Sequence, residues 1–256
     1  MKWPTEINFI RHGRSAYNEM GEAKSKDPLY QDFLRAFGKD LRSEETQVLA
    51  RLIRNRYQLG SGDYDTPLTE TGRIQSHTVG QALKDKLDLP ETIFLSPHLR
   101  ASQTLSSLIA GWPALISVPA VSEPRLREQE HGLALVFNDK RVFQAFYPDQ
   151  KLLHDLEGPY WYRFPQGENV PDGIERIRSF IGTLVRDYSE KKILVISHHL
   201  TILFFLAAIL RWSCEEFIRT DKECKPINCG LTTFRGNPEV GDDGRLELIS
   251  YNVKLY

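Results

Sequence analysis

A short apolar run near the N-terminus, ending in a group of charged residues, constrains the fold most. Ile7, Phe9 and Ile10 predict a brief buried strand, because such a run beside a glycine-containing break is typical of a core strand. The run continues into Arg11-His12-Gly13-Arg14-Ser15, where glycine permits a tight turn and a close approach to a ligand. Ser15 can cap a following helix. Arginines and a histidine at a helix N-terminus favour an anion, and phosphate suits them best.

The same stretch carries a family signature. Residues 11–18 match the pattern Arg-His-Gly-x-Ser-x-x-Asn, and the chain thereby resembles the histidine phosphatase superfamily, the phosphoglycerate mutase-like family. The resemblance implies an α/β fold, a three-layer α/β/α sandwich with a mostly parallel central sheet and helical cap insertions. It assigns phosphate contact to Arg11 and Asn18. The alternative is an ordinary strand-to-helix turn with solvated charges, and the rest of the chain decides between them.

The next matching block surrounds Arg100. Residues 96–104 fit the family pattern Ser-x-x-x-Arg-Ala-x-x-Thr, in which the arginine contacts phosphate. We expect Ser96 to be the N-cap of a helix, with Pro97 at its first helical position. Arg100 then lies in the first turn, where a cation opposes the helix dipole unless it binds an anion. Taken alone, Arg100 would be interpreted as a surface residue. Together with the motif at residues 11–18, it is predicted to be a phosphate ligand.

Two later blocks supply a carboxylate and a second histidine. Residues 125–132 resemble the family's Arg-Leu-x-Glu-x-x-x-Gly, whose glutamate acts as acid or base at the leaving group, and Glu128 takes that position. Ser197-His198 resembles the family's second histidine, which the resemblance makes a phosphate ligand. His199 replaces the glycine that usually follows. A histidine tolerates a positive φ less readily than glycine, so the local backbone conformation there is an open question.

The chain is expected to form a single domain over residues 1–256 with cap insertions at 19–62 and 133–163. The first insertion is too long for a plain loop in a compact domain. The second is rich in aromatic residues, which predicts a helical cap packed by aromatic side chains; a substrate-binding wall is the alternative. Arg14, Tyr162 and Arg163 are candidate substrate-binding residues. Further strands are expected at residues 92–95, 117–121, 193–196, 230–234 and 245–252.

Composition excludes several classes of function. The formal net charge is −1, so no overall field attracts nucleic acid or a membrane surface. Residues 193–210 carry no formal charge and are long enough to span a membrane, but Ser197-His198-His199 divides them into a strand and a buried helix. Cys214, Cys224 and Cys229 are expected to be free thiols in a reducing compartment. With an N-terminus that lacks a signal-peptide pattern, we expect a cytoplasmic protein.

Together these blocks predict a phosphomonoesterase. Neutral His12 would attack phosphorus and form a phosphohistidine, and Glu128 would act as general acid and then as general base. Arg11, Arg100 and His198, assisted by Asn18, would hold the phosphoryl oxygens in place of a metal, so neither metal nor cofactor is required. The expected partners are a small phosphorylated substrate and inorganic phosphate; no oligomeric state is predicted.

Two other functions compete with this one. A cofactor-dependent phosphoglycerate mutase would use the same residues, but the long first insertion, Arg14 and the region after Gly132 argue against it. A non-catalytic phosphate-binding protein would be expected to lack the nucleophile or the acid, and His12 and Glu128 fill both positions. The remaining histidines are expected to have structural roles outside the site: His77, His98, His131 and His154.

Overall fold

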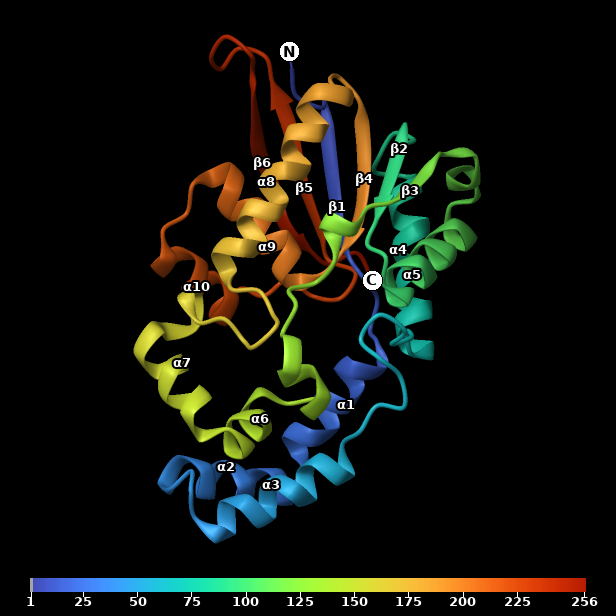
Figure 1. Cartoon of the computed structure of the whole chain (residues 1–256). Helices are drawn as coiled ribbons and strands as arrows, with labels where there is room; N and C mark the ends of the chain where they lie inside the picture. Colours follow the sequence, from blue (N-terminus) through green and yellow to red (C-terminus); the bar gives the residue numbers. More distant parts are fainter. Residues whose placement is uncertain (1) are drawn as a thin grey trace. The chain divides into compact units, whose positions relative to one another are not determined.

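The computed structural model describes residues 2–256, which form two compact units (Figure 1). The first unit comprises the chain up to Ser15, Pro67–Glu128 and Gly173–Tyr256. The second comprises Ala16–Thr66 and Gln129–Asp172. The stretches predicted as insertions, 19–62 and 133–163, fall within the two segments of this second unit.

The first unit is built on a six-stranded sheet with the order β3-β2-β4-β1-β5-β6. The strands are β1 (Glu6–Arg11), β2 (Thr92–Leu95), β3 (Ala120–Ser122), β4 (Lys192–Ser197), β5 (Leu231–Asn237) and β6 (Arg245–Val253). Strands β1 to β4 pair in parallel, whereas β5 runs antiparallel to both β1 and β6. The predicted α/β fold with a mostly parallel sheet is therefore confirmed.

One strand lies elsewhere than predicted. Residues 117–121 were expected to be extended, but Pro113–Ser117 forms the 3-10 helix η1 and β3 starts only at Ala120. All three residues of β3 are exposed, because it is an edge strand. An exposed edge strand leaves no alternation of buried and exposed positions in the sequence, so its register could not be read from hydrophobicity.

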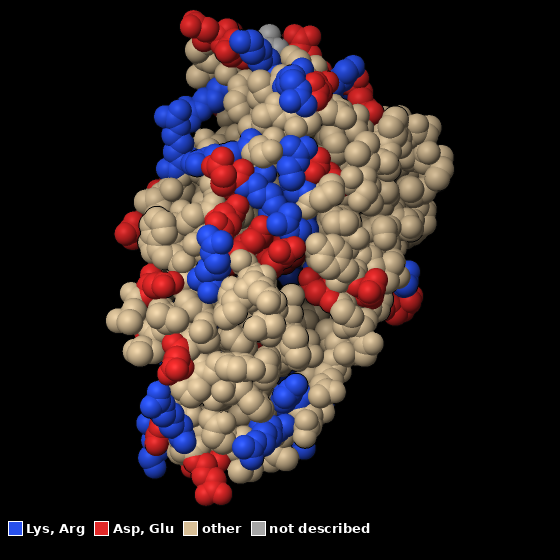
Figure 2. Space-filling model, in the orientation of Figure 1, with Lys and Arg blue, Asp and Glu red and all other residues tan. Residues whose placement is uncertain are grey.

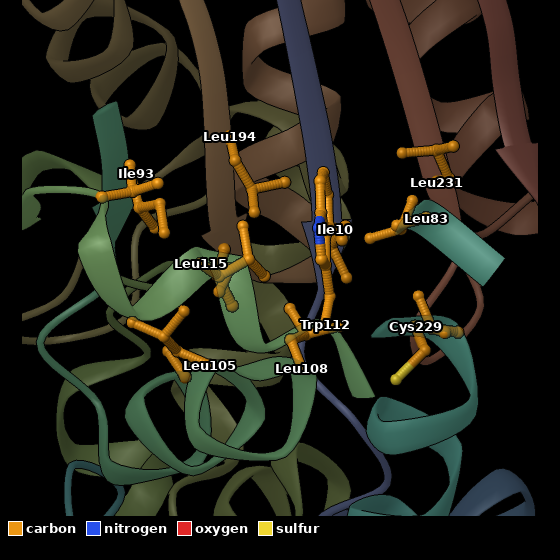
Figure 3. Packing of buried hydrophobic residues seen from close by; sticks show 14 residues of the cluster. Ile10, Leu83, Ile93, Leu105, Leu108, Trp112, Leu115, Leu194, Cys229 and Leu231 are labelled. Atoms are coloured by element: carbon orange, nitrogen blue, oxygen red, sulfur yellow. The ribbon is translucent and has the colours of Figure 1, made fainter. Parts of the chain in front are cut away.

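Helices cover both faces of this sheet, which gives the three expected layers (Figure 1). On one face, Ile10 and Leu194 pack in the same core cluster as Leu83 of α4 (Glu70–Lys84) and Leu108 of α5 (Leu99–Gly111), as Figure 3 shows. On the other face, strand residues contact α8 (Val170–Asp187) and α9 (His199–Leu210). The ring centroids of Phe9 and Phe205 are 4.5 Å apart, and those of Phe94 and Phe180 are 5.3 Å apart. Successive strand residues thus serve opposite layers.

The uncharged stretch 193–210 forms β4 and α9, as the sequence predicted. α9 is apolar nearly all round and almost wholly buried, which is typical of a helix within the core. Within residues 2–256 the model has no helix whose length and apolar character would allow it to span a bilayer. The short α10 (Cys214–Glu223) follows, with Ser213 and Glu216 forming a capping box.

The second unit is helical. It contains α1 (Ala16–Lys26), α2 (Pro28–Lys39), α3 (Glu44–Arg56), the 3-10 helix η3 (Gly132–Phe137), α6 (Lys140–Phe146) and α7 (Pro148–Trp161). Its core is aromatic, with Phe33, Phe143 and Tyr162 among the buried residues. A buried ion pair joins Lys24 Nζ to Asp139 Oδ2 at 2.7 Å. The aromatic residues of the second predicted insertion thus serve mainly to pack this unit.

Charge on the surface is mixed. On the face drawn in Figure 2, basic and acidic side chains are mixed within the same groups. Broad uncharged areas lie between these groups. This distribution agrees with the formal net charge of −1. Any concentration of positive charge that acts on a ligand must therefore be local.

Candidate active site

The ends of two adjacent parallel strands bring the two predicted histidines together. Arg11 at the end of β1 is paired in register with Ser197 at the end of β4, so the next residues, His12 and His198, are neighbours. Their ring centroids lie 5.1 Å apart, and the His12 amide donates to the Ser197 carbonyl at 2.9 Å. This edge, outside the carboxyl ends of the strands, is where ligands bind in open α/β sheets.

His12 has the tautomer that a nucleophile needs. Its side chain is buried, with 4% of the residue exposed, and Nδ1 lies 2.7 Å from the carbonyl oxygen of Gly13. Because a carbonyl oxygen only accepts, Nδ1 carries the proton and Nε2 keeps its lone pair. Burial lowers the pKa of His12 well below 6.5, and the charges of Arg100 and Arg11 lower it further. The ring is therefore neutral at physiological pH.

Two guanidinium groups belong to the same cluster. Arg100 is 5% exposed, and its Nε donates to His198 Nδ1 at 3.4 Å. Arg11 donates from Nη1 to the carbonyl of Pro226 at 2.7 Å. Burial lowers the pKa of Arg11; Glu128 counteracts this, and Arg100 adds to it. Two cations held close together in a buried place favour a ligand with two negative charges.

The start of α5 differs from the prediction. Ser96 is not an N-cap, because α5 begins at Leu99 and His98 occupies the cap position without a side-chain cap bond. The Ser96 hydroxyl instead contacts two imidazoles, His198 Nε2 at 2.6 Å and His98 Nδ1 at 3.0 Å. Arg100 still lies in the first turn of α5, so its positive charge opposes the helix dipole unless it binds an anion.

His98 belongs to this cluster, contrary to the sequence prediction. Its ring centroid lies 4.5 Å from that of His198, and 2% of the residue is exposed. Two further residues were missed: Thr104 Oγ1 accepts from the Gly13 amide at 3.0 Å, and Asn228 Nδ2 donates to the His12 carbonyl at 3.0 Å. The position of His98 three residues beyond β2, at the same edge of the sheet, is the signal that could have indicated it.

Glu128 lies at the end of a loop that is bonded to β4 and α9. Its Oε1 accepts from the Leu200 amide at 3.2 Å. Ser197 Oγ donates to the Leu126 carbonyl at 2.8 Å, and Thr201 Oγ1 donates to the Arg127 carbonyl at 2.7 Å. These bonds fix the glutamate near the residues that follow His198. Its charge acts on Arg11, so it lies within electrostatic range of the cluster.

His199 needs no unusual backbone. It is the first residue of α9, and it is not among the non-glycine residues with positive φ. Its Nε2 lies 2.8 Å from Asp221 Oδ1. The backbone at position 199 is therefore helical and does not require glycine.

The remaining predicted residues are Arg14 in the first unit and Asn18, Tyr162 and Arg163 in the second. In the first unit, the Arg14 amide donates to Gln75 Oε1 at 3.1 Å. Asn18 lies in α1 of the second unit. In that unit Tyr162 is 4% exposed and donates to Gln150 Oε1 at 2.9 Å, while Arg163 pairs with Asp172 at 2.7 Å. The roles predicted for these four residues stay predictions.

No group of three or more His, Cys, Asp or Glu side chains in residues 2–256 is arranged to hold a metal ion. The cysteines form no disulfide among themselves in this part of the chain. Burial raises the pKa of Cys229 to about 11, so its thiol stays protonated at neutral pH.

The chain is similar to several known phosphatases and mutase-like proteins. It is 28% identical to the phosphoglycerate mutase-like protein AT74H of Arabidopsis thaliana over 193 residues, 68% of this chain and 64% of that protein. A broad-range acid phosphatase of Saccharomyces cerevisiae, DET1, is 29% identical over 102 residues, 37% of this chain and 28% of that protein. The chain thus spans less than two thirds of the lengths of these curated relatives.

Solved structures show the same fold. The alpha-ribazole phosphatase of Shigella flexneri superposes with a TM-score of 0.66 at 17% identity, over 97% of this chain and 96% of that chain. The mycobacterial glucosyl-3-phosphoglycerate phosphatase superposes with a TM-score of 0.63 at 19% identity, over 98% and 99% of the two chains. At these identities the likeness establishes the fold alone.

A family model for the histidine phosphatase superfamily (branch 1) matches residues 50–241. The matched range contains Arg100, Glu128 and His198, whereas His12 precedes it. The structure nevertheless places His12 beside His198 at the same edge of the sheet. On this match to most of its length, the chain belongs to the histidine phosphatase superfamily, branch 1.

Proposed function

We propose that the protein hydrolyses a small phosphomonoester through a phosphohistidine on His12. The observation that carries this proposal is the state of the His12 ring, which is neutral, bonded through Nδ1 to Gly13 and next to Arg100 and Arg11. A neutral imidazole nitrogen beside two cations is suited to attack a phosphoryl group whose oxygens those cations hold. The names of the similar proteins support a phosphorylated small molecule as substrate.

The reaction would proceed in two displacements. His12 Nε2 attacks phosphorus, the P–O ester bond breaks, and the proton of Glu128 passes to the departing alkoxide. Glu128 then takes a proton from water, the resulting hydroxide attacks phosphorus, and the P–N bond breaks to release inorganic phosphate and restore His12. Arg11, Arg100 and His198 would neutralise the equatorial oxygens, with each important donor contributing about 3 kcal/mol to barrier lowering. The chain's own donors thus take the part that a metal ion has in other phosphatases.

An isomerase is the second candidate, because a relative of this chain is named as phosphoglycerate mutase-like. A mutase must exclude water and retain a bisphosphate while the intermediate reorients. The long stretch 19–62 and the presence of Arg14 still favour a hydrolase in our proposal. Interconversion of 3-phosphoglycerate and 2-phosphoglycerate, measured against phosphate release, separates the two activities.

The test is a phosphate-release screen over a panel of sugar phosphates, nucleotides and phosphoglycerates. His12→Ala should reduce kcat/KM by about 10⁴-fold or more, and Arg100→Ala by about 10²- to 10³-fold. The matched control is His77→Ala, which removes a half-buried histidine of α4 outside the cluster and should leave turnover unchanged.

A second readout traps the intermediate. A rapid quench with labelled substrate should give an acid-labile, base-stable phosphoenzyme in the parent protein and none in His12→Ala. Turnover by His12→Ala at the parental rate would overturn the proposed mechanism, and so would a phosphoenzyme stable to acid. Alanine variants of Asn18, Arg14, Tyr162 and Arg163, screened on the same panel, test the roles predicted for those residues.

A further inference from the structure

A chain of three buried side chains lies behind the predicted phosphate ligand His198. Ser96 follows β2, His98 precedes α5, and His198 follows β4. The exposed fractions of these residues are 1%, 2% and 0%. Ser96 Oγ lies 2.6 Å from His198 Nε2 and 3.0 Å from His98 Nδ1, so the hydroxyl bridges the two rings.

The chemistry of the donors fixes the direction of these bonds. Arg100 Nε can only donate, and it donates to His198 Nδ1 at 3.4 Å. Nδ1 of His198 therefore accepts, and its ring proton lies on Nε2, which donates to Ser96 Oγ. Ser96 Oγ also accepts from the His98 amide at 3.4 Å, so both lone pairs of the oxygen are used. The hydroxyl therefore donates its one proton to His98 Nδ1.

This arrangement leaves Nδ1 as the ring nitrogen of His198 that faces the cluster, next to Arg100. The three unprotonated oxygens of a dianionic phosphoryl group only accept, so Nδ1 must carry a proton when it binds one of them. His198 then becomes an imidazolium in surroundings that oppose its charge: burial, Arg100, His12, His98 and Arg11 all act against it. Two features stabilise the doubly protonated ring of His198: the negative charge of a bound dianion, and the hydroxyl of Ser96, which accepts from Nε2.

We propose that Ser96 and His98 are positioning residues for His198: they hold its Nε2 proton, turn Nδ1 toward the phosphoryl group, and support the imidazolium that forms there. The step adds one proton from solvent to Nδ1 and ends the hydrogen bond that Nδ1 accepts from Arg100 Nε; Nε2–H continues to donate to Ser96, and Ser96 to His98. This inference rests on the proposed function, because it assumes that the cluster receives a phosphoryl group. It assigns a role to Ser96, which belongs to the family pattern but has no part in the mechanism above, and to His98, which the pattern does not specify.

The experiment reads the protonation of His198 directly. Imidazole nitrogen spectra of the protein labelled with ¹⁵N-histidine, with His198→Gln used for assignment, report which ring nitrogen carries the proton. In the free protein His198 should carry it on Nε2, and saturating inorganic phosphate should convert the ring to the imidazolium. Ser96→Ala and His98→Phe should each mix the tautomers of the free ring and weaken phosphate binding by about 10- to 100-fold.

Conservative variants separate positioning from packing. Ser96→Thr retains a hydroxyl and His98→Asn retains an acceptor near Nδ1, so both should bind phosphate within about threefold of the parent. Ser102→Ala is the matched control, because the hydroxyl of this half-buried serine of α5 donates to the Leu99 carbonyl of its own helix at 2.9 Å. It should change neither the spectrum nor the affinity.

Either of two results overturns the proposal: a His198 proton on Nδ1 in the free parent protein, or unchanged tautomer and phosphate affinity in a folded Ser96→Ala. If Ser96→Ala does not fold, the variants His98→Phe and His98→Asn and the spectrum of the parent protein still test the proposal. Neither readout needs turnover. A protein with the expected spectra and phosphate binding but no phosphatase activity would refute the proposed function and leave this inference standing.

Discussion

The proposed attack of His12 on phosphorus needs a neutral ring, and the surroundings of His12 keep its ring neutral. Burial lowers its pKa well below 6.5, and the positive charges of Arg100 and Arg11 add to the effect. For a base, a lowered pKa means that the neutral form persists to a more acidic pH. The lone pair on Nε2 is therefore available throughout the physiological range and for some distance below it.

This environment predicts a shift in the pH profile. With a p-nitrophenyl ester, whose leaving group needs no proton, the acid limb of kcat/KM should lie below pH 6.5. Arg100→Gln removes a neighbouring positive charge, so the pKa of His12 should rise and the acid limb should move up by about one pH unit. Arg178→Gln, an exposed arginine of α8, is the control. Superimposable profiles for Arg100→Gln and the parent would contradict this account of His12.

The sequence predicted some members of the histidine cluster and missed others for a physical reason. Arg11, His12, Arg100 and His198 each lie close to the end of a strand or in the first turn of a helix, where local patterns carry information. Ser96 had a local explanation, as a cap before Pro97, which was wrong. Its actual partner is His198, 102 residues away in the chain, and no local pattern reports a bond of that span.

At the scale of elements, α4 holds the turn that carries His12. The Thr69 amide and hydroxyl both donate to the Arg14 carbonyl, at 2.9 Å and 3.1 Å. A Cβ on Gly72 would lie 2.1 Å from the same carbonyl oxygen, so only glycine allows this approach. The start of α4 thus fixes the backbone two residues after His12.

Close packing of α4 against α5 predicts an unequal response to two similar mutations. A Cβ on Gly80 would lie 2.4 Å from the Leu108 carbonyl oxygen, whereas one on Gly182 of α8 meets nothing within 4 Å. Gly80→Ala should therefore reduce the free energy of unfolding by about 1–3 kcal/mol. Gly182→Ala should raise it by up to about 1 kcal/mol, because alanine is the better helix former.

Urea unfolding followed by circular dichroism measures both variants. Equal changes in the two unfolding free energies would show that helix propensity, not the contact between α4 and α5, governs the response. The start of the helix has a local signal in the sequence, since Thr69 is its N-cap and accepts from the Gly72 amide. The close approach of its glycines to α5 was not, because a glycine in a helical pattern does not reveal its neighbour.

For the whole molecule, the buried histidines link stability to pH. The pKa values of His12 and His198 both lie well below 6.5, chiefly because of burial, so the unfolded chain binds more protons than the folded one when the pH falls below that value. Stability is therefore complete above the unfolded pKa and is lost on acidification.

The expected loss can be measured without substrate. Between pH 6.5 and 5.5 the free energy of unfolding should fall by about 1 kcal/mol for each of the two histidines. His12→Asn and His198→Gln should each remove one such contribution from the slope, whereas His77→Ala should leave the slope unchanged. A parent protein whose unfolding free energy is flat over this interval would contradict the burial of these rings in the neutral form.

The overall architecture was largely predictable from the order of apolar runs and polar strand ends, and the six-stranded α/β fold agrees with it. The grouping of 16–66 with 129–172 in one compact unit was not read from the sequence. The contacts of Lys24 with Asp139 and of Tyr30 with Asp139 join residues more than a hundred positions apart. Hydrophobic periodicity predicts the helices that supply such residues but not which helices meet.

The central position of β1 has a consequence for how the protein is made. β1 is translated first, yet its two neighbours in the sheet are β4 and β5, with Ile10 opposite both Ile196 and Leu231. On the ribosome the nascent chain therefore carries β1 without its partners, with Ile7, Phe9 and Ile10 uncovered, until β4 and β5 have emerged. Pairings of such long sequence separation form slowly and expose the chain to aggregation. The buried surroundings that keep His12 neutral thus cannot form until β4 has been synthesised.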